Sequence, residues 1–177
     1  MEKLPQRTVI LMRHAKSDWK ANLVDIDRPL NARGEGDALK MASFLTTKLS
    51  GPVKVVSSTA RRSRDTARTL VNALPQATLV VEDLLYLASP CALFKLIEDN
   101  DSEECLVLVG HNPGLEELVE YVDPDLLSRA GIRKIFPTCA VYAYLVSNSA
   151  KDGPKDRQRK ADWDFRYLFH QRPKDLD

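Results

Sequence analysis

The sequence predicts an α/β fold: a three-layer α/β/α sandwich whose mostly parallel, mixed sheet ends in a C-terminal hairpin. Short apolar segments without polar alternation recur along the chain, as is typical of strands that are buried on both faces. Longer segments with apolar residues at helical spacing lie between most of these strands, which favours parallel pairing. The last two strand-like segments have no helix between them, and this order predicts the hairpin.

The first part of the chain alternates strands with helical patterns. Residues 8–12 form an almost wholly apolar run, which predicts a buried strand. Apolar residues at helical spacing predict a helix over residues 37–49, with Asn31 or the pair Arg33-Gly34 near its start. A second strand is expected at residues 53–56.

The next helix is expected to begin near Ser58 or Thr59, because either hydroxyl group can cap a first helical turn. The helix runs to about Leu74 and stops before Pro75, whose ring is incompatible with a helix interior. Residues 77–81 form the third expected strand.

The second half continues this alternation and then changes. Residues 90–97 predict a short helix, and the apolar run 105–109 predicts another buried strand. Pro113 suits the first position of a helix that continues over 114–122, because no backbone donor is needed there.

Two final strand-like segments, residues 140–146 and 163–169, are joined by a polar connector with a Gly-Pro turn signal. This arrangement predicts the hairpin at one end of the sheet. The basic run 155–160 inside the connector is interpreted as a solvated loop.

Length and charge limit the classes of protein to consider. The 177-residue chain suits one domain with one core, so we expect residues 1–177 to form a single domain. The net charge of +1 gives no reason to expect nucleic acid or a membrane as a partner. The early apolar run at residues 9–12 is too short for a signal peptide, and we therefore expect a cytoplasmic protein.

The three cysteines, Cys91, Cys105 and Cys139, are scattered along the chain without a CxxC spacing. No cluster of His or Asp accompanies them, so a zinc site is not expected. They are interpreted as reduced, buried or half-buried thiols. The sequence accordingly predicts neither a metal nor a cofactor.

Cationic or imidazole side chains follow three of the predicted strands. Arg13 and His14 follow the first strand, Arg61 and Arg62 lie just after the second, and His111 follows the strand at 105–109. In open α/β sheets, ligands bind outside the carboxyl ends of the strands. Parallel neighbouring strands would bring these side chains to one edge of the sheet.

A cluster of this kind needs an anion, because several cations placed together repel one another. The helix that begins near Thr59 adds free N–H groups and the positive end of its dipole. The planar guanidinium group of arginine matches phosphate oxygens in pairs. The sequence therefore predicts a phosphate-binding site.

Each of these residues also has a structural interpretation. A single His or Arg is more often a core or surface residue than a catalyst, and His170 in the last strand is interpreted as structural. Arg61 and Arg62 cannot both face the sheet edge, since neighbouring helical residues point about 100° apart. Arg64 and Arg68 continue a solvated helix face.

Four segments resemble motifs of the histidine phosphatase superfamily. Residues 11–17, LMRHAKS, are similar to its first signature in the RHA form, and residues 57–67 to its second, SSPxxRAxQTA. Gly-His-Asn-Pro at 110–113 resembles the third. Residues 27–34, DRPLNARG, resemble the DRPL segment of SixA-type phosphohistidine phosphatases, and residues 137–140 fit that branch as well.

The resemblance implies a phosphoglycerate mutase-like fold and a metal-independent phosphatase that forms a covalent phosphohistidine. It implies that His14 is the nucleophile and that Arg13, Arg62 and His111 form the phosphate pocket, with Asn112 as a further phosphate ligand. No cofactor is implied, and the partner is a phosphorylated protein or a small phosphoester.

The match to the second motif selects Arg62 over Arg61 as the phosphate-pocket residue. The sequence also departs from the family motifs in two respects. Thr59 and Asp65 stand where the second motif has Pro and Gln. Larger relatives place a proton-donating Glu between the second and third motifs, but residues 82–86 show no acid in a clearly equivalent place. The proton donor is therefore not identified from the sequence.

The branch resemblance favours protein phosphohistidine as the substrate. A small-molecule phosphomonoesterase acting on a sugar or nucleotide phosphate is the first alternative. A mutase is disfavoured because the stretch between the second and third motifs is compact. A non-catalytic phosphate-binding adaptor is the alternative of another class, against which the intact His14 and His111 argue. The sequence does not predict an oligomeric state.

Overall fold

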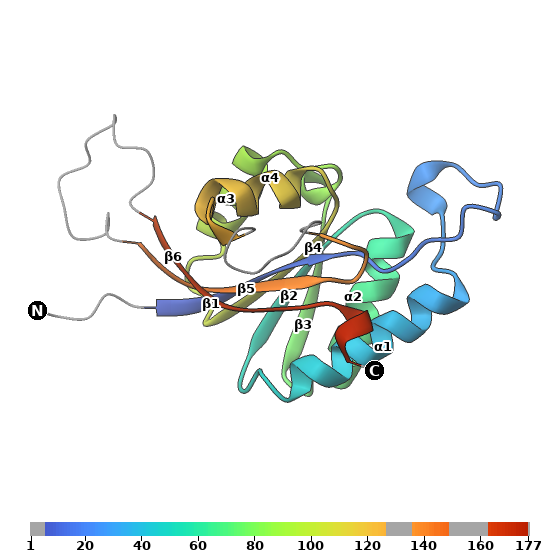
Figure 1. The fold of residues 1–177 in the computed structure, drawn as a ribbon. Coiled ribbons are helices and arrows are strands. Elements are labelled where there is room, and N and C mark those ends of the chain that lie inside the picture. The colour runs from blue at the N-terminus through green and yellow to red at the C-terminus, as the bar shows by residue number, and fades with distance from the viewer. Residues whose placement is uncertain (1–5, 127–135, 149–162, 177) are drawn as a thin grey trace, which may run out of the picture.

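The computed structural model describes residues 6–126, 136–148 and 163–176, which form one mixed six-stranded sheet between helices (Figure 1). The strands are β1 (Gln6–Arg13), β2 (Val53–Ser58), β3 (Ala77–Glu82), β4 (Cys105–Gly110), β5 (Val141–Asn148) and β6 (Trp163–Gln171). The α-helices of the described part are α1 (Ala32–Thr46), α2 (Arg61–Ala73), α3 (Pro90–Asp99) and α4 (Gly114–Val122). The predicted fold class is confirmed.

The strand order β3-β2-β4-β1-β5-β6 places β1 and β4 in the middle of the sheet. The first four of these strands run parallel, whereas β5 is antiparallel to β1 and β6 is antiparallel to β5. The C-terminal hairpin therefore extends the parallel sheet at one edge. Because β1, β2 and β4 are parallel neighbours, their carboxyl ends meet at one edge of the sheet.

The two faces of β1 pack into separate cores. Ile10 and Met12 belong to the core beneath α1 and α2, whereas Val9 and Leu11 belong to the core beneath α3 and α4. All four are fully buried. Figure 1 shows the two helix pairs on opposite faces of the sheet. Burial on both faces explains why this strand lacks polar alternation.

Helix α1 begins at Ala32, earlier than residue 37, where the apolar pattern begins, and the prediction that Asn31 lies near its start is confirmed. Asn31 caps it by accepting the N–H of Gly34 across 2.9 Å. The first turn packs so closely on the preceding loop that a Cβ at Gly34 would lie 2.1 Å from the carbonyl oxygen of Lys16. The missing side chain at Gly34 therefore allows this approach.

Helix α2 begins at Arg61, and neither predicted hydroxyl caps it. Its N-cap residue is Ala60, and no side chain bonds to the first turn there. The Ser58 hydroxyl instead accepts the N–H of Ala60 across 3.3 Å and also contacts His111 Nε2. Helix α4 begins at Gly114, one position after the expected Pro113, which is its N-cap residue.

The segment between β1 and α1 is a loop closed at its base. An isolated bridge joins Ser17 to Leu30, and the N–H of Asp18 donates to the carbonyl oxygen of Pro29 across 2.8 Å. The loop carries a short 3-10 helix, Asp25–Asp27, and lies beyond the carboxyl end of β1 (Figure 1).

Among the described residues, no helix is long and apolar enough to cross a membrane. The predicted connector and its basic run at 155–160 fall largely or wholly outside the described residues.

Candidate active site

The carboxyl ends of the central strands meet at a cavity of about 490 Å³. Arg13 is the last residue of β1 and His14 follows it, His111 follows β4, and Arg62 lies in the first turn of α2. The structure brings these four side chains together with Asn112. We call this space the site cavity.

Of the two adjacent arginines, Arg62 faces the site cavity. Its side chain is 3% exposed, whereas that of Arg61 is 50% exposed and pairs with Asp65 across 3.6 Å. Every N–H-bearing atom of the Arg62 guanidinium group has a partner within the site: Nε donates to His14 Nε2 across 3.2 Å, and Nη2 to His111 Nδ1 across 3.3 Å. The Nη1 atom donates to the carbonyl oxygen of Asp25.

The His14 imidazole is held in one tautomer. Its Nδ1 lies 2.7 Å from the carbonyl oxygen of Ala15, which can only accept, so Nδ1 carries the hydrogen. Nε2 therefore carries a lone pair, which accepts the hydrogen bond from Arg62 Nε. Burial, followed by the charges of His111, Arg62 and Arg13, outweighs the Ala15 contact and lowers the pKa of His14 to about 3. The ring is neutral at pH 7.

The His111 imidazole has the opposite tautomer. Because Arg62 Nη2 donates to Nδ1, the hydrogen lies on Nε2 and is donated to the Ser58 hydroxyl oxygen across 2.6 Å. The Ser63 hydroxyl lies 3.3 Å from the same nitrogen. Burial and the charge of Arg62 lower the pKa of His111 to about 4. The centroids of the His14 and His111 rings are 5.0 Å apart.

The Arg13 side chain offers a buried donor that is not satisfied by the described residues. Its Nη1 donates to the carbonyl oxygen of Phe136 across 2.7 Å, but its Nε has no partner. Burial lowers the pKa of Arg13, and nearby Glu116 partly offsets this effect. An unpaired buried guanidinium donor is costly unless an anion binds it.

Asn112 lines the site cavity, but its amide donors are used elsewhere. The Nδ2 atom donates to Glu116 Oε2 across 2.9 Å and to the carbonyl oxygen of Phe136 across 3.3 Å. A contact between this amide and a phosphate oxygen would require the side chain to turn. In the free protein Asn112 instead fixes the same carbonyl group that accepts from Arg13.

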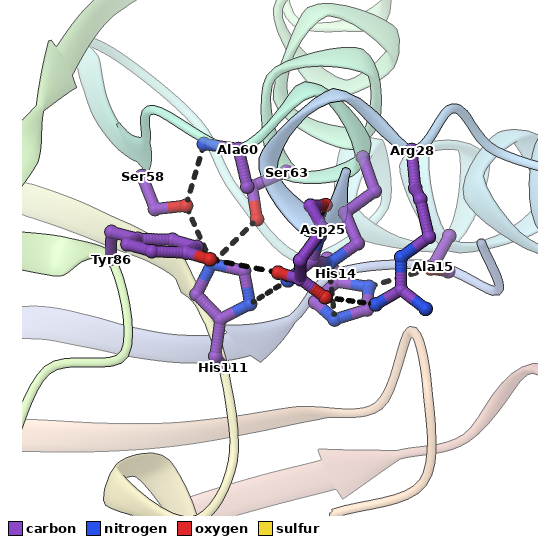
Figure 2. Close-up of polar contacts among 10 residues, drawn as sticks. His14, Ala15, Asp25, Arg28, Ser58, Ala60, Ser63, Tyr86 and His111 are labelled. Atoms are coloured by element: carbon purple, nitrogen blue, oxygen red, sulfur yellow. Dashed lines mark hydrogen bonds and ion pairs between the residues drawn. The ribbon is translucent and has the colours of Figure 1, made fainter. Parts of the chain in front are cut away.

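Sequence reasoning missed one acidic residue of the site. Asp25 is the one carboxylate that lines the site cavity among the described residues. Its Oδ2 accepts from Arg62 Nη2 across 2.9 Å and from the Tyr86 hydroxyl across 2.8 Å, and its Oδ1 pairs with Arg28 (Figure 2). The segment 27–34 that resembles the family motif begins two residues later, which is the sequence signal that could have pointed to this loop.

The described residues contain no group of three His, Cys, Asp or Glu side chains that could hold a metal ion. Cys105 and Cys139 are buried as predicted, and burial raises the pKa of both thiols, whereas Cys91 is exposed, contrary to the prediction. His170 lies away from the site cavity in β6, where its Nδ1 is 2.7 Å from the Tyr167 hydroxyl and its ring stacks on Tyr142.

Comparisons with known proteins identify the family and the fold. The family model of the Histidine phosphatase superfamily (branch 1) matches residues 9–85. An uncharacterized protein of Mycobacterium tuberculosis is 35% identical over 148 residues, which cover 80% of this chain and 90% of that protein. An uncharacterized chloroplastic protein of Arabidopsis thaliana is 43% identical over 65 residues, covering 36% of this chain and only 30% of that protein.

Among solved structures, SixA from Agrobacterium tumefaciens aligns with a TM-score of 0.75 and 28% identity, covering 93% of this chain and 97% of that one. A protein histidine phosphatase SixA complexed with tungstate also gives a TM-score of 0.75, at 18% identity over 96% of this chain and 99% of that one. A mycobacterial glucosyl-3-phosphoglycerate phosphatase gives a TM-score of 0.61 at 15% identity, covering 91% of this chain and 97% of that one. The chain therefore belongs to the histidine phosphatase superfamily, and its structure is of the SixA type.

Proposed function

We propose that the protein is a metal-independent phosphatase that hydrolyses protein phosphohistidine through a covalent phosphohistidine on His14. One observation carries this proposal: a buried, neutral imidazole presents the lone pair of Nε2 to a cavity lined by Arg13, Arg62 and His111. Neutral imidazole is the form that can attack phosphorus.

In the first step, Nε2 of His14 attacks phosphorus and the bond to the leaving group breaks, with its electron pair departing on the leaving group. Arg13 and Arg62 bind the equatorial phosphoryl oxygens, where catalysis is mostly electrostatic positioning. Arg62 exchanges its contacts with His14 and Asp25 for these oxygens. The Ala15 carbonyl stabilises the positive charge that develops on the ring through the Nδ1 hydrogen.

His111 assists after a change of protonation. A bound phosphate dianion raises the pKa of the neighbouring imidazole, so that Nδ1 gains a hydrogen and donates it to a phosphoryl oxygen. The contact between Nε2 and Ser58 keeps the ring in the same orientation. In the second step, water attacks phosphorus, the P–N bond breaks and its electron pair returns to Nε2 of His14.

The leaving group and the rim of the site favour phosphohistidine on a protein. A phosphohistidine whose other ring nitrogen carries a proton can leave as neutral imidazole without a strong acid, because the conjugate acid of imidazole has a pKa of about 6.5. Trp19 and Leu87, which line the site cavity, and nearby Val24 are 73%, 57% and 67% exposed. Exposed apolar residues gathered around a site are typical of a surface that meets another protein. A structural relative with the same fold, SixA complexed with tungstate, is a protein histidine phosphatase according to its name.

A small-molecule phosphomonoesterase is the second candidate. The cavity volume of about 490 Å³ lies within the range of small-ligand sites. A structural relative with the same fold acts on glucosyl-3-phosphoglycerate according to its name. The adaptor alternative predicts phosphate binding without turnover.

A side-by-side substrate assay tests the proposed function. We expect kcat/KM to be highest for a phosphohistidine protein or phosphoramidate, lower for aryl phosphates and lowest for alkyl phosphates. Trp19→Ala should raise KM for the phosphoprotein and leave phosphoramidate turnover nearly unchanged. Glu82→Gln and Asp83→Asn are matched controls with little expected effect, because neither side chain lines the site cavity. Sugar phosphates as the best substrates would favour the phosphomonoesterase, and absence of phosphate release would favour the adaptor.

A further inference from the structure

The Asp25 carboxylate contacts two side chains, those of Arg62 and Tyr86, that in turn touch the two site imidazoles. Arg62 contacts both Asp25 Oδ2 and His14 Nε2, at 2.9 Å and 3.2 Å. Tyr86, whose hydroxyl donates to the same Oδ2, packs edge-on against the His111 ring at 5.4 Å between centroids. Asp25 thus lies within reach of a group bound between the two imidazoles (Figure 2).

The loop between β1 and α1 is itself fixed in place, and this fixes the position of the Asp25 carboxylate. Its base is closed by the bridge between Ser17 and Leu30. Arg28 is 8% exposed, pairs with Asp25 Oδ1 and stacks over the Trp19 ring, with 3.7 Å between the guanidinium carbon and the ring centroid. The Asp25 side chain itself is 47% exposed, so water can reach it.

Substrate binding changes the charges around Asp25. In the free protein, burial disfavours its ionised form, but the hydrogen bonds from Tyr86 and Arg62 and the charges of Arg62 and Arg28 outweigh this and lower the pKa of Asp25. A bound phosphoryl group takes the Arg62 donor for itself and places negative charge beside the carboxylate. Loss of a cationic partner and gain of a like charge both favour the protonated carboxyl group.

We propose that Asp25 is a catalytic residue, the proton donor to the leaving group, and that it extends the activity to phosphate monoesters. This inference rests on the proposed function of His14. As Nε2 of His14 bonds to phosphorus and the P–O bond breaks, the carboxyl proton of Asp25 passes to the departing alkoxide and yields an alcohol. The Asp25 carboxylate then takes a proton from the attacking water, whose oxygen bonds to phosphorus as the P–N bond breaks.

The competing explanation is that Asp25 only positions Arg62. The two roles differ in their dependence on the leaving group. A proton donor matters most for a basic alkoxide and least for a leaving group that is stable as an anion. A positioning residue acts on the phosphoryl group, which all substrates share, and its removal should slow all of them to the same extent.

Asp25→Asn tests this difference, because asparagine keeps the size of the side chain and removes its proton. The matched control is Asp27→Asn, an exposed carboxylate of the same 3-10 helix that does not line the site cavity. The substrates are ethyl phosphate, phenyl phosphate, 4-nitrophenyl phosphate and phosphoramidate. We expect Asp25→Asn to lower kcat/KM for ethyl phosphate by about 10² to 10³ and for 4-nitrophenyl phosphate by less than about tenfold.

The pH profile provides a second readout. For wild-type protein, kcat with phenyl phosphate should fall at alkaline pH as Asp25 loses its proton in the complex, and Asp25→Asn should lack this limb. The charged or titratable groups facing the carboxyl are Arg62 from α2, Arg28 from its own loop, Tyr86 after β3, and the two imidazoles. Asp25→Glu should restore part of the ethyl phosphate activity.

Each result has a defined meaning. An equal loss for all four substrates, an unchanged pH profile, or no detectable hydrolysis of ethyl phosphate by the wild type would overturn the role of Asp25. Those results leave the proposed function standing as long as phosphoramidate turnover still depends on His14. Failure of wild-type protein to turn over phosphoramidate would instead refute the proposed function itself.

Discussion

The Nδ1 hydrogen of His14 is donated to the carbonyl oxygen of Ala15 across 2.7 Å, and this contact leaves the ring lone pair on Nε2, the nitrogen that we propose attacks phosphorus. Ala15 is held in turn by α2, since its N–H donates to Thr66 Oγ1 across 3.0 Å. The Thr66 hydroxyl donates to the carbonyl oxygen of Arg62 across 2.7 Å. One threonine thus connects the segment of the proposed nucleophile, His14, to the proposed phosphate-binding residue, Arg62.

Thr66→Val should therefore impair both folding and turnover. The change keeps the side-chain shape but leaves the buried N–H of Ala15 without a partner, which costs about 1–3 kcal/mol of unfolding free energy. The matched control is Thr69→Val, because Thr69 also bonds to the carbonyl four residues earlier, that of Asp65, but does not touch the site. Urea unfolding and phosphoramidate kinetics measure the two effects. Equal results for both valine variants would contradict this role of Thr66.

The two adjacent arginines should differ sharply in their contribution to turnover. Arg62→Ala removes the buried guanidinium that contacts both imidazoles, and loss of such a transition-state donor costs about 3 kcal/mol, or about a hundredfold in kcat. Arg61→Ala removes a half-exposed partner of Asp65 and should change kcat little. Steady-state kinetics of both variants test this prediction. Similar losses of kcat in the two variants would contradict the assignment of Arg62, and not Arg61, to the phosphate pocket.

Activity should not depend on a bound metal ion. The candidate site offers cationic and imidazole groups with one carboxylate, which is a poor ligand set for Mg²⁺ or Ca²⁺. Phosphoramidate hydrolysis should survive dialysis against EDTA. Complete loss of activity that added Mg²⁺ restores would rule out the proposed mechanism.

Acid should destabilise the fold through the two site imidazoles. Their folded-state pKa values of about 3 and about 4 lie below the unfolded value of about 6.5, so as pH falls the unfolded state binds protons first. Their contribution to stability is intact above pH 6.5 and declines toward the folded-state values. At pH 5 each imidazole should lower the free energy of unfolding by up to about 2 kcal/mol relative to pH 7.

Urea unfolding of the wild type, His14→Asn and His111→Asn at pH 5 and pH 7, without phosphate, measures this effect. Each variant should lose less stability than the wild type between the two values. An identical pH dependence in all three proteins would contradict the lowered pKa values.

The arrangement of elements follows from the sequence where burial dominates. The central residues 9–12 of β1 and the whole of β4 lack polar alternation, so each strand can be predicted without tertiary information. The start of α1 is harder to predict, because its first turn carries polar residues and Gly34 and lacks an apolar face. The cap at Asn31 and the close contact of Gly34 with Lys16 determine that boundary.

The site can be predicted only in part for a related reason. Arg13, His14 and His111 directly follow apolar strands, so topology alone is expected to bring them to one edge. Asp25 and Tyr86 reach the same cavity from segments without periodicity, and their contact spans 61 positions in the chain. Such contacts depend on how the loop closes over the sheet edge, which local sequence patterns do not report.

The most direct test of the central claim is the identity of the residue that carries phosphate during turnover. Protein mixed with excess phosphoramidate and quenched rapidly without acid should contain an alkali-stable, acid-labile phosphate, which mass spectrometry locates on His14. His14→Ala should retain the wild-type circular dichroism spectrum and show neither the adduct nor turnover. Phosphate found on a serine or cysteine, or continued turnover by His14→Ala, would contradict the account.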